Sequence, residues 1–117
     1  FPYDESLRQQ LIESTKNRQQ NRPALLFRDV GVYGCLPGPR LETAAEIRRL
    51  RIDGCTIVGM TAMPECALAR ERNIPYAGIS VTVNAGAGIN DMPVAVDQIH
   101  AVMNEGMTWI RDIISSL

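Results

Sequence analysis

The chain has 117 residues, of which 45% are hydrophobic and 21% are charged, so it is long enough to bury a hydrophobic core. Its formal net charge of −1 argues against a basic nucleic-acid-binding arm and against a polybasic membrane patch. Three cysteines without a CxxC spacing and a single histidine, His100, favour reduced thiols over disulfides or a metal site. We therefore expect a cytoplasmic protein that holds no metal and binds neither nucleic acid nor membrane.

The N-terminal third predicts one helix followed by two short strands. Asp4 or Ser6 can cap a helix in which Leu7 and Leu11 share a face. The polar stretch 14–23 predicts the end of that helix and an exposed loop. The runs ALLF (24–27) and GVYGCL (31–36) have the composition of strands, which a turn at Arg28 and Asp29 would join.

Thr43 is predicted to open a second helix, because Glu46 follows it at the spacing of a capping box. Gly54 is predicted to end this helix, because glycine readily adopts the left-handed backbone conformation found at helix C-termini. The apolar stripe of this helix comprises Ala44, Ile47 and Leu50.

The rest of the chain predicts strands at 55–60 and 76–83, with a helix between them from about Pro64 to about Asn73. A loop of small residues follows at 84–90, and a last helix begins near Pro93. Residues spaced three or four positions apart in this helix predict an apolar stripe that faces the core. They are Ile99, Val102, Met103, Gly106, Ile110, Ile113 and Leu117.

Apolar strands that alternate with helices predict an α/β fold, a layered sheet of parallel strands with helices on both faces. Ligands of such sheets bind at the carboxyl ends of the strands. The rule selects three places here: the turn after Leu36, the pair Met60 and Thr61, and the segment 83–86. The first of these leads directly to Glu42.

Three segments together resemble the C-terminal half of the trimeric purine nucleoside phosphorylase and methylthioadenosine phosphorylase family. They are YGCLPGPRLETAAEIRRL (33–50), IVGMTAMPECALARERNIPYAGI (57–79) and VTVN (81–84). The resemblance implies that residues 1–117 are the C-terminal part of a single phosphorylase domain, which acts as a homotrimer without a cofactor. It also implies that the phosphate-binding glycine loop and an Arg-His phosphate site lie in the N-terminal half, so we expect the chain alone to be inactive. The start at Phe1 rather than Met is what we expect of a piece of a longer protein.

The resemblance makes Glu42 and Asn84 the catalytic candidates. Glu42 would accept a hydrogen bond from the purine N1–H, since an ionised carboxylate only accepts. Asn84 would face N7 and the 6-position, where its amide can donate to O6 of a 6-oxopurine. The alternatives are an acid favoured by the helix dipole at Glu42 and a simple turn residue at Asn84.

Three further residues would contact the phosphate or the sugar. Thr61 would bind phosphate, unless it is an ordinary helix cap. Met60 would pack under the ribose or belong to the core. Val96 would face the 5′ substituent, where an apolar side chain suits a methylthio group, or it would be a core residue.

The remaining candidates are less informative. Leu41 stands where the family usually has Phe on the purine face, so stacking should be weaker. Ala85 and Gly86 would line the base side of the pocket, in a segment that is either a flap or a plain loop. His100 is expected at the helix surface. The three cysteines, Cys35, Cys55 and Cys66, are expected to be packing residues.

The resulting hypothesis is phosphorolysis of S-methyl-5′-thioinosine to hypoxanthine and 5-methylthioribose 1-phosphate, with phosphate as co-substrate. The alternatives within the family are a 5′-methylthioadenosine phosphorylase and a general inosine and guanosine phosphorylase. An alternative of another class is a non-catalytic nucleoside-binding module.

Overall fold

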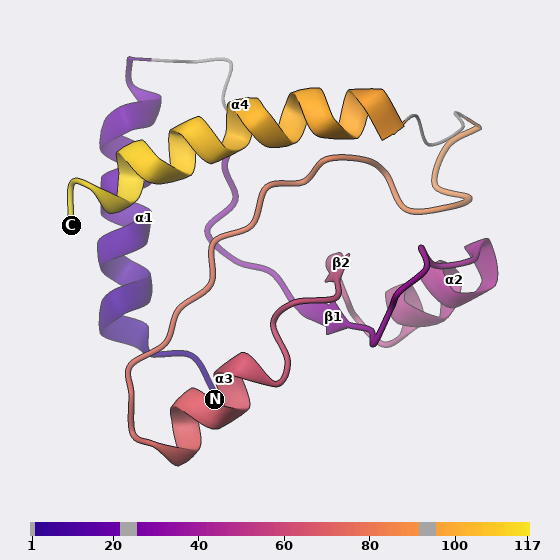
Figure 1. Cartoon of the computed structure of the whole chain (residues 1–117), viewed down its shortest axis with the longest axis horizontal. Coiled ribbons are helices and arrows are strands. Elements are labelled where there is room, and N and C mark those ends of the chain that lie inside the picture. Colours follow the sequence, from indigo (N-terminus) through magenta and orange to yellow (C-terminus); the bar gives the residue numbers. More distant parts are fainter. Residues whose placement is uncertain (1, 22–25, 92–95) are drawn as a thin grey trace.

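The computed structural model describes residues 2–21, 26–91 and 96–117. Along the chain lie α1 (Glu5–Gln19), β1 (Tyr33–Cys35), α2 (Ala44–Ile52), β2 (Ile57–Gly59), α3 (Glu65–Glu71) and α4 (Val96–Ile114). The two strands pair in parallel, with Tyr33 opposite Ile57 and Cys35 opposite Gly59. In Figure 1, α4 crosses α1 on one side of the molecule, while α2 and the strands lie on the other. The alternation of helices with a parallel sheet confirms the predicted α/β class.

The helix α1 begins where the sequence predicts. Asp4 caps it, with its carboxylate accepting the Leu7 N–H at 2.8 Å. It ends at Gln19, inside the polar stretch, where two hydroxyl groups find partners within the fold. Thr15 donates to the Leu11 carbonyl at 2.7 Å, and Ser14 donates to the Ile113 carbonyl of α4 at 3.0 Å.

The strand predictions are confirmed in part. The runs 31–36 and 55–60 contain β1 and β2. In the run 24–27, residues 24 and 25 lie outside the described residues, and 26–27 form no strand. The predicted strand at 76–83 is wrong: this segment forms no ladder, because the described part of the chain places no strand beside it.

Contacts of Tyr76, rather than a strand ladder, hold the start of that segment. The Tyr76 ring stacks on Tyr3 with centroids 5.9 Å apart, and its hydroxyl donates to Glu65 of α3 at 3.2 Å. The Tyr76 carbonyl accepts the Asp4 N–H at 2.7 Å. The segment therefore joins the starts of α1 and α3.

The predicted signals of α2 and α3 are confirmed. Thr43 is the N-cap of α2 and forms the complete capping box with Glu46, while Gly54 adopts φ +87° just past its end. Pro64 occupies the N-cap of α3, and Asn73 follows the helix with φ +53°.

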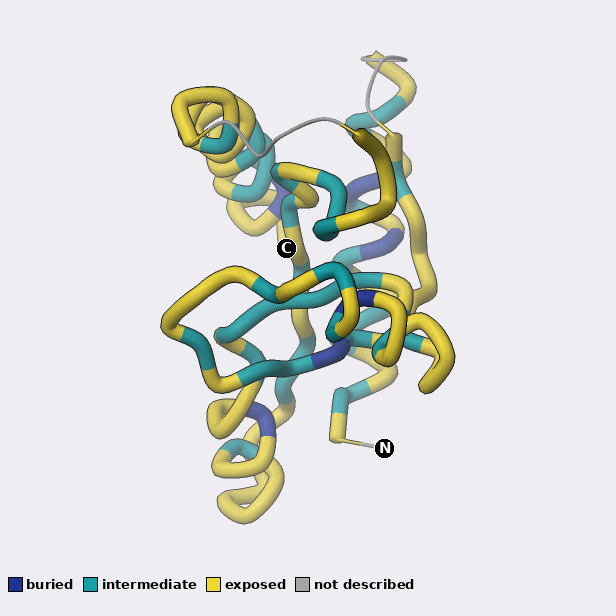
Figure 2. The backbone as a smooth tube through the Cα atoms, turned by 90° about the vertical axis from the view of Figure 1, so that its right-hand side faces the viewer, coloured by how far each residue is buried: buried dark blue, intermediate teal, exposed yellow. Residues whose placement is uncertain are grey.

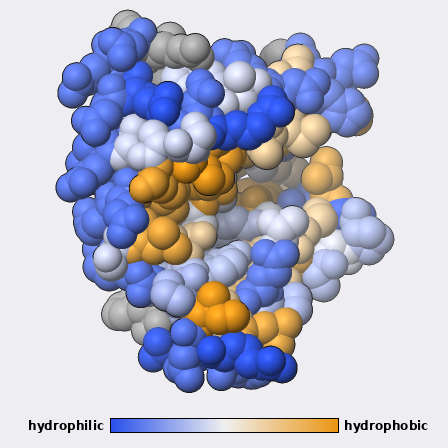
Figure 3. Space-filling model, turned by 60° about the vertical axis from the view of Figure 1, so that its left-hand side comes forward, coloured by the Kyte–Doolittle hydropathy of each residue, from blue (hydrophilic) through white to orange (hydrophobic). Residues whose placement is uncertain are grey.

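The helix α4 buries much less of its apolar stripe than predicted. Ile113 is buried, but Val102 and Met103 are 41% and 42% exposed. Leu117 lies beyond the helix end and is 54% exposed, so a core-facing role for the whole stripe is wrong. Figure 2 shows that few stretches of the chain are buried, and Figure 3 shows apolar side chains gathered around a hollow on one face.

The accessible surface explains this partial burial. It measures 8925 Å², whereas a folded monomer of 12.9 kDa is expected to expose about 6,300 Å². The stripe on α4 therefore has no complete covering layer among the described residues. None of the helices described is both long enough and apolar enough to span a bilayer.

Gly106 marks the place where α4 meets the extended segment 76–83. A Cβ at Gly106 would lie 2.5 Å from Cγ1 and 2.7 Å from Cγ2 of Val81. A β-branched side chain has few ways to move aside. The close approach of helix and segment therefore requires glycine here.

We predict that Gly106→Ala lowers the free energy of unfolding by about 1 kcal/mol. Alanine should gain up to about 1 kcal/mol of helix propensity, but overpacking costs about 1–3 kcal/mol. Urea unfolding measures the difference, with Asn104→Ala at an exposed position of α4 as the control. In a Val81→Ala background the loss should disappear; an equal loss in both backgrounds would contradict the contact.

Candidate functional site

A small pocket lies where β1 ends and α2 begins. It has a volume of about 90 Å³ and is lined by Leu36, Pro37, Gly38, Arg40, Glu42 and Glu46. Gly38 adopts φ +66°, and a Cβ there would lie 2.8 Å from the Met60 sulfur. The turn after β1 thus passes against the residue that follows β2, so the carboxyl ends of both strands meet at this pocket.

Glu42 places an unpaired oxygen in this pocket region. Its Oε1 is buried, and it has no hydrogen-bond partner in the structure. An acceptor that is withdrawn from water without a donor is energetically costly. The favoured ligand is therefore one that brings a donor to this oxygen.

Arg40 and Glu46 form a charged pair beside Glu42. The Arg40 guanidinium donates to both carboxylate oxygens of Glu46, at 2.8 Å each, and to the Leu41 carbonyl at 3.1 Å. Glu46 Oε2 also accepts the Thr43 N–H at 2.7 Å and the Thr43 hydroxyl at 3.0 Å. The sequence predicted Glu46 only as part of the helix cap, so this pair was not predicted. An arginine in the GPR turn, close in sequence to Glu46, could have indicated it.

The pair shifts the titration of both groups. Hydrogen bonds from Arg40, and then those from Thr43, lower the pKa of Glu46 from 4.5 to about 2. The Glu46 carboxylate in turn raises the pKa of Arg40. Both groups therefore remain charged at neutral pH.

The loop that follows Val83 packs on the first turns of α2. A Cβ on Gly86 would lie 2.9 Å from Cδ1 of Ile47, and a Cβ on Gly88 would lie 2.9 Å from Cβ of Ala44. Gly88 adopts φ +74°, which glycine tolerates. The structure thus brings the loop with Ala85 and Gly86 to the same helix start as Glu42.

One N–H of the Asn84 amide is bonded within its own loop. Asn84 is exposed, and its Nδ2 donates to the Ala85 carbonyl at 2.8 Å. This bond holds the side chain against its own loop, as in a turn residue. The NH2 group has two N–H donors, so the second one can donate to a ligand while this bond is kept.

Thr61 and Tyr33 lie close to each other beyond β2. The Thr61 hydroxyl is 3.3 Å from the Tyr33 hydroxyl, which lies directly over Gly59. Thr61 is not the cap of α3, because the N-cap is Pro64, so the interpretation as an ordinary cap is wrong. Its phosphate-binding role stays a prediction. Tyr33 was not predicted as a site residue, and a tyrosine in a short strand carries no specific signal.

The other predicted residues have varied surroundings. Met60 is half-buried under Gly38, whereas Leu41 is 54% exposed. Val96 is the first residue of α4 and is 60% exposed, so its interpretation as a core residue is wrong. His100 is exposed, as expected. All three cysteines are free thiols; Cys66 is buried and Cys35 and Cys55 are half-buried, as packing residues are.

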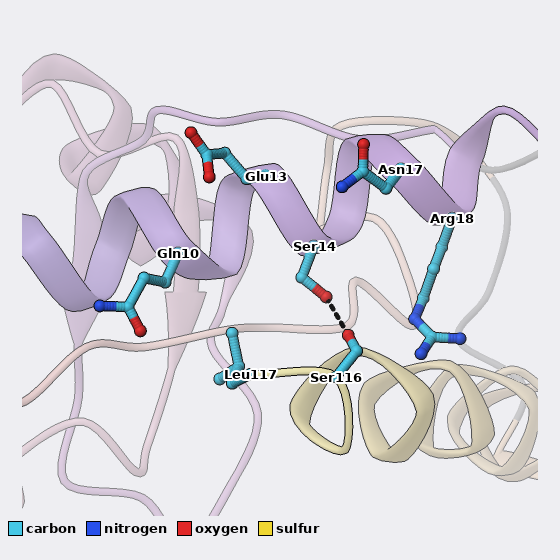
Figure 4. Close-up of a pocket in the computed structure, with 7 residues that line it drawn as sticks. All are labelled: Gln10, Glu13, Ser14, Asn17, Arg18, Ser116 and Leu117. Atoms are coloured by element: carbon cyan, nitrogen blue, oxygen red, sulfur yellow. Dashed lines mark hydrogen bonds between the residues drawn. The ribbon is translucent and has the colours of Figure 1, made fainter.

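A larger pocket, of about 340 Å³, lies between α1 and the end of the chain (Figure 4). The Ser14 and Ser116 hydroxyls lie 2.6 Å apart at this pocket, and Arg18 Nε is buried without a partner. Its lining contains none of the predicted site residues: Gln10, Glu13, Ser14, Asn17, Arg18, Ser116 and Leu117. We place the candidate site at the smaller pocket, where both strand ends and an unpaired carboxylate oxygen meet. Among the described residues, no three His, Cys, Asp or Glu side chains are grouped to hold a metal ion.

The lowered pKa of Glu46 predicts an acid-sensitive contribution to stability. The folded-state pKa is below 4.5, so the contribution is complete above about pH 4.5 and is lost as the pH falls towards 2. The difference in unfolding free energy between the wild type and Glu46→Gln should therefore shrink over this interval. Urea unfolding at several pH values measures it, with Glu105→Gln on α4 as the control for losing an exposed carboxylate. A difference that grows on acidification would contradict the pairing.

Comparisons with known proteins show which proteins the chain is similar to. A protein of Pseudomonas syringae pv. tomato, named a probable S-methyl-5′-thioinosine phosphorylase, is 45% identical over 111 residues, which are 95% of this chain and 43% of that protein. A probable 6-oxopurine nucleoside phosphorylase of Thermococcus kodakarensis is 42% identical over 94% of this chain and 39% of its own length. The chain thus spans less than half the length of these relatives.

Solved structures show the same fold. The methylthioadenosine phosphorylase of Schistosoma mansoni, in complex with adenine, superposes with a TM-score of 0.84 at 26% identity. The match covers 97% of this chain and 44% of that one. A family model described as the phosphorylase superfamily matches residues 1–117. With this match over its whole length, the chain belongs to the phosphorylase superfamily.

Proposed function

We propose that the protein containing this chain catalyses the phosphorolysis of a 6-oxopurine nucleoside, with S-methyl-5′-thioinosine as the preferred substrate. The products are hypoxanthine and 5-methylthioribose 1-phosphate. The observation that carries the proposal is the buried, unpartnered Oε1 of Glu42 at the carboxyl ends of the strands. The N1–H of a 6-oxopurine is a donor of the kind that this oxygen lacks. Two relatives, named a probable S-methyl-5′-thioinosine phosphorylase and a probable 6-oxopurine nucleoside phosphorylase, support the same substrate class.

The reaction separates charge across the glycosidic bond. A phosphate oxygen forms a bond to the anomeric carbon while the bond from that carbon to the purine nitrogen breaks, and its electron pair moves onto the base. Asn84 would donate to N7 or O6, where the negative charge grows, through the N–H that does not bind the Ala85 carbonyl. Glu42 would hold N1–H, and Thr61 would contact phosphate. Groups directed at developing charge lower the barrier, and positioning of phosphate adds to it.

The complete site requires more than these residues. We propose that residues 1–117 form the C-terminal part of one phosphorylase domain, which the 44% coverage of the Schistosoma structure supports. The large accessible surface, 8925 Å², is what such a part would leave uncovered. The rest of the domain would bring most of the phosphate site, so that the chain alone is inactive. We further propose a cytoplasmic homotrimer that uses phosphate as co-substrate and needs no metal or organic cofactor.

A second candidate activity is that of a 5′-methylthioadenosine phosphorylase. It is favoured by the likeness to the Schistosoma enzyme, whose structure contains adenine. A 6-aminopurine lacks the N1–H that Glu42 would accept, and its exocyclic amine would face the donor side of the Asn84 amide. This activity would therefore need a flipped Asn84 amide and a different partner for Glu42.

We expect the complete enzyme to prefer 5′-methylthioinosine over 5′-methylthioadenosine in kcat/KM by about 10²-fold or more. Sites built to pair a polar group discriminate strongly when that group is missing. Asn84→Asp should narrow or invert the ratio, because a carboxylate accepts from an amine and cannot donate to O6. Steady-state kinetics on both nucleosides measure the change.

Two results would contradict this proposal. Equal cleavage of both bases by the wild type would refute the assignment of Glu42 and Asn84. Binding of the nucleosides without turnover, in the presence of phosphate, would instead favour a nucleoside-binding module.

The second specificity prediction concerns Val96 and the 5′ end of the sugar. A buried 5′-hydroxyl beside valine would lack a partner at a cost of about 1–3 kcal/mol, whereas a methylthio group would bury apolar area at about 25 cal/mol per Å². We therefore expect 5′-methylthioinosine to exceed inosine in kcat/KM by at least about tenfold. Val96→His should reduce this ratio, and Val96→Leu, the apolar control, should keep it. A ratio that both variants leave unchanged would remove Val96 from the sugar site.

A further inference from the structure

We propose that Arg40 and Glu46 act as positioning residues that set the orientation of Glu42 and thereby the selectivity for the base. The inference rests on the proposed function, because it assigns to Glu42 the reading of the purine N1–H. Neither Arg40 nor Glu46 needs to touch the substrate. Their effect passes through the backbone on both sides of Glu42.

The two peptide groups that flank Glu42 are both tied to this pair. On one side, the Leu41 carbonyl accepts from Arg40 Nη1 at 3.1 Å. On the other side, the Thr43 N–H donates to Glu46 Oε2 at 2.7 Å. Rotation about the φ and ψ bonds of Glu42 turns these two peptide groups. The pair, joined by two bonds of 2.8 Å, therefore restrains both backbone torsions of Glu42.

The Glu42 segment has few restraints besides this pair. Its Oε1 makes no hydrogen bond, and the preceding Leu41 is 54% exposed. Glu42 also precedes the N-cap Thr43, so it lies outside the regular hydrogen bonds of α2. An unrestrained residue here would have to be ordered by the ligand, which would reduce affinity.

The pair also directs the hydrogen bonds of the Arg40 guanidinium away from Glu42. Arg40 lines the same pocket as Glu42, and a guanidinium fork pairs readily with a free carboxylate. Because Glu46 receives both arms of the fork, Arg40 leaves the buried Oε1 of Glu42 without a hydrogen bond. Losing Glu46 would release Arg40 to compete with the base.

The test is a double-mutant cycle in the complete enzyme. Arg40→Met removes the fork but keeps the capping box of Glu46 with Thr43. Glu42→Gln removes the acceptor-only group that is being positioned. Arg40→Lys keeps the charge without the fork. For each variant, kcat/KM is measured for 5′-methylthioinosine and 5′-methylthioadenosine, together with KM for phosphate.

We expect Arg40→Met to reduce the ratio of the two kcat/KM values by about 10- to 100-fold, since small displacements of a positioned group can cost about 10²-fold. KM for phosphate should stay unchanged, and Arg40→Lys should be intermediate. In the Glu42→Gln background, Arg40→Met should not lower the ratio further. A general structural role would instead affect both nucleosides and phosphate alike, in both backgrounds.

The outcomes distinguish failure of the positioning role from failure of the assignment of Glu42. An unchanged ratio in Arg40→Met, or full additivity with Glu42→Gln, overturns the positioning role while the phosphorylase remains. If Glu42→Gln itself leaves the ratio unchanged, the assignment of Glu42 fails and the positioning role fails with it. Calorimetric binding of hypoxanthine and adenine to the same variants gives the selectivity without turnover, so loss of catalysis cannot hide the result.

Discussion

The geometry of this site depends on the hydrogen bonds that the Glu46 carboxylate accepts. This carboxylate accepts four hydrogen bonds, two from Arg40 and two from Thr43. These bonds connect the turn after β1 to the first turn of α2. Residues of that turn and that helix line the pocket. Its shape therefore depends on the hydrogen bonds by which Glu46 holds the turn against the helix.

Local hydrogen bonds matter here because the hydrophobic core is small. Among the described residues, the buried hydrophobic side chains are Ile12, Ile47, Cys66 and Ile113. Only Ile47 belongs to α2, and the loop with Gly86 packs directly on it. The candidate site is therefore ordered by a capping box, an ion pair and a two-stranded sheet more than by burial. An exposed ion pair contributes little to stability on average, so what the Arg40 pair provides is geometry.

The parts that could be predicted from sequence are those with local causes. The Thr43 capping box, the left-handed Gly54 and the strands β1 and β2 are confirmed. The position of the site at their carboxyl ends stays a prediction. The strand expected at 76–83 was wrong because a ladder needs a neighbouring strand, which the local sequence does not report. The burial predicted for the apolar stripe of α4 was wrong for the same reason. The periodicity of a sequence shows that a helix has an apolar face, but not which part of the protein covers that face. The pairing of Arg40 with Glu46 depends on the Gly38 turn, whose path only the fold shows.

Glu42 and Asn84 differ in what a ligand must do to them. Glu42 Oε1 is already desolvated and unpaired, so a donor from the base relieves a penalty that the folded chain carries. Asn84 Nδ2 donates one N–H to the Ala85 carbonyl, and its exposed second N–H would exchange a bond to water for a bond to the ligand, with little net gain in the ground state. In the proposed reaction, that exchange becomes favourable when negative charge develops on the purine, because a hydrogen bond to a charged acceptor is stronger. In this proposal the two residues would have different roles: Glu42 would contribute to binding of the base, and Asn84 would contribute to the transition state, where an interaction accelerates the chemical step.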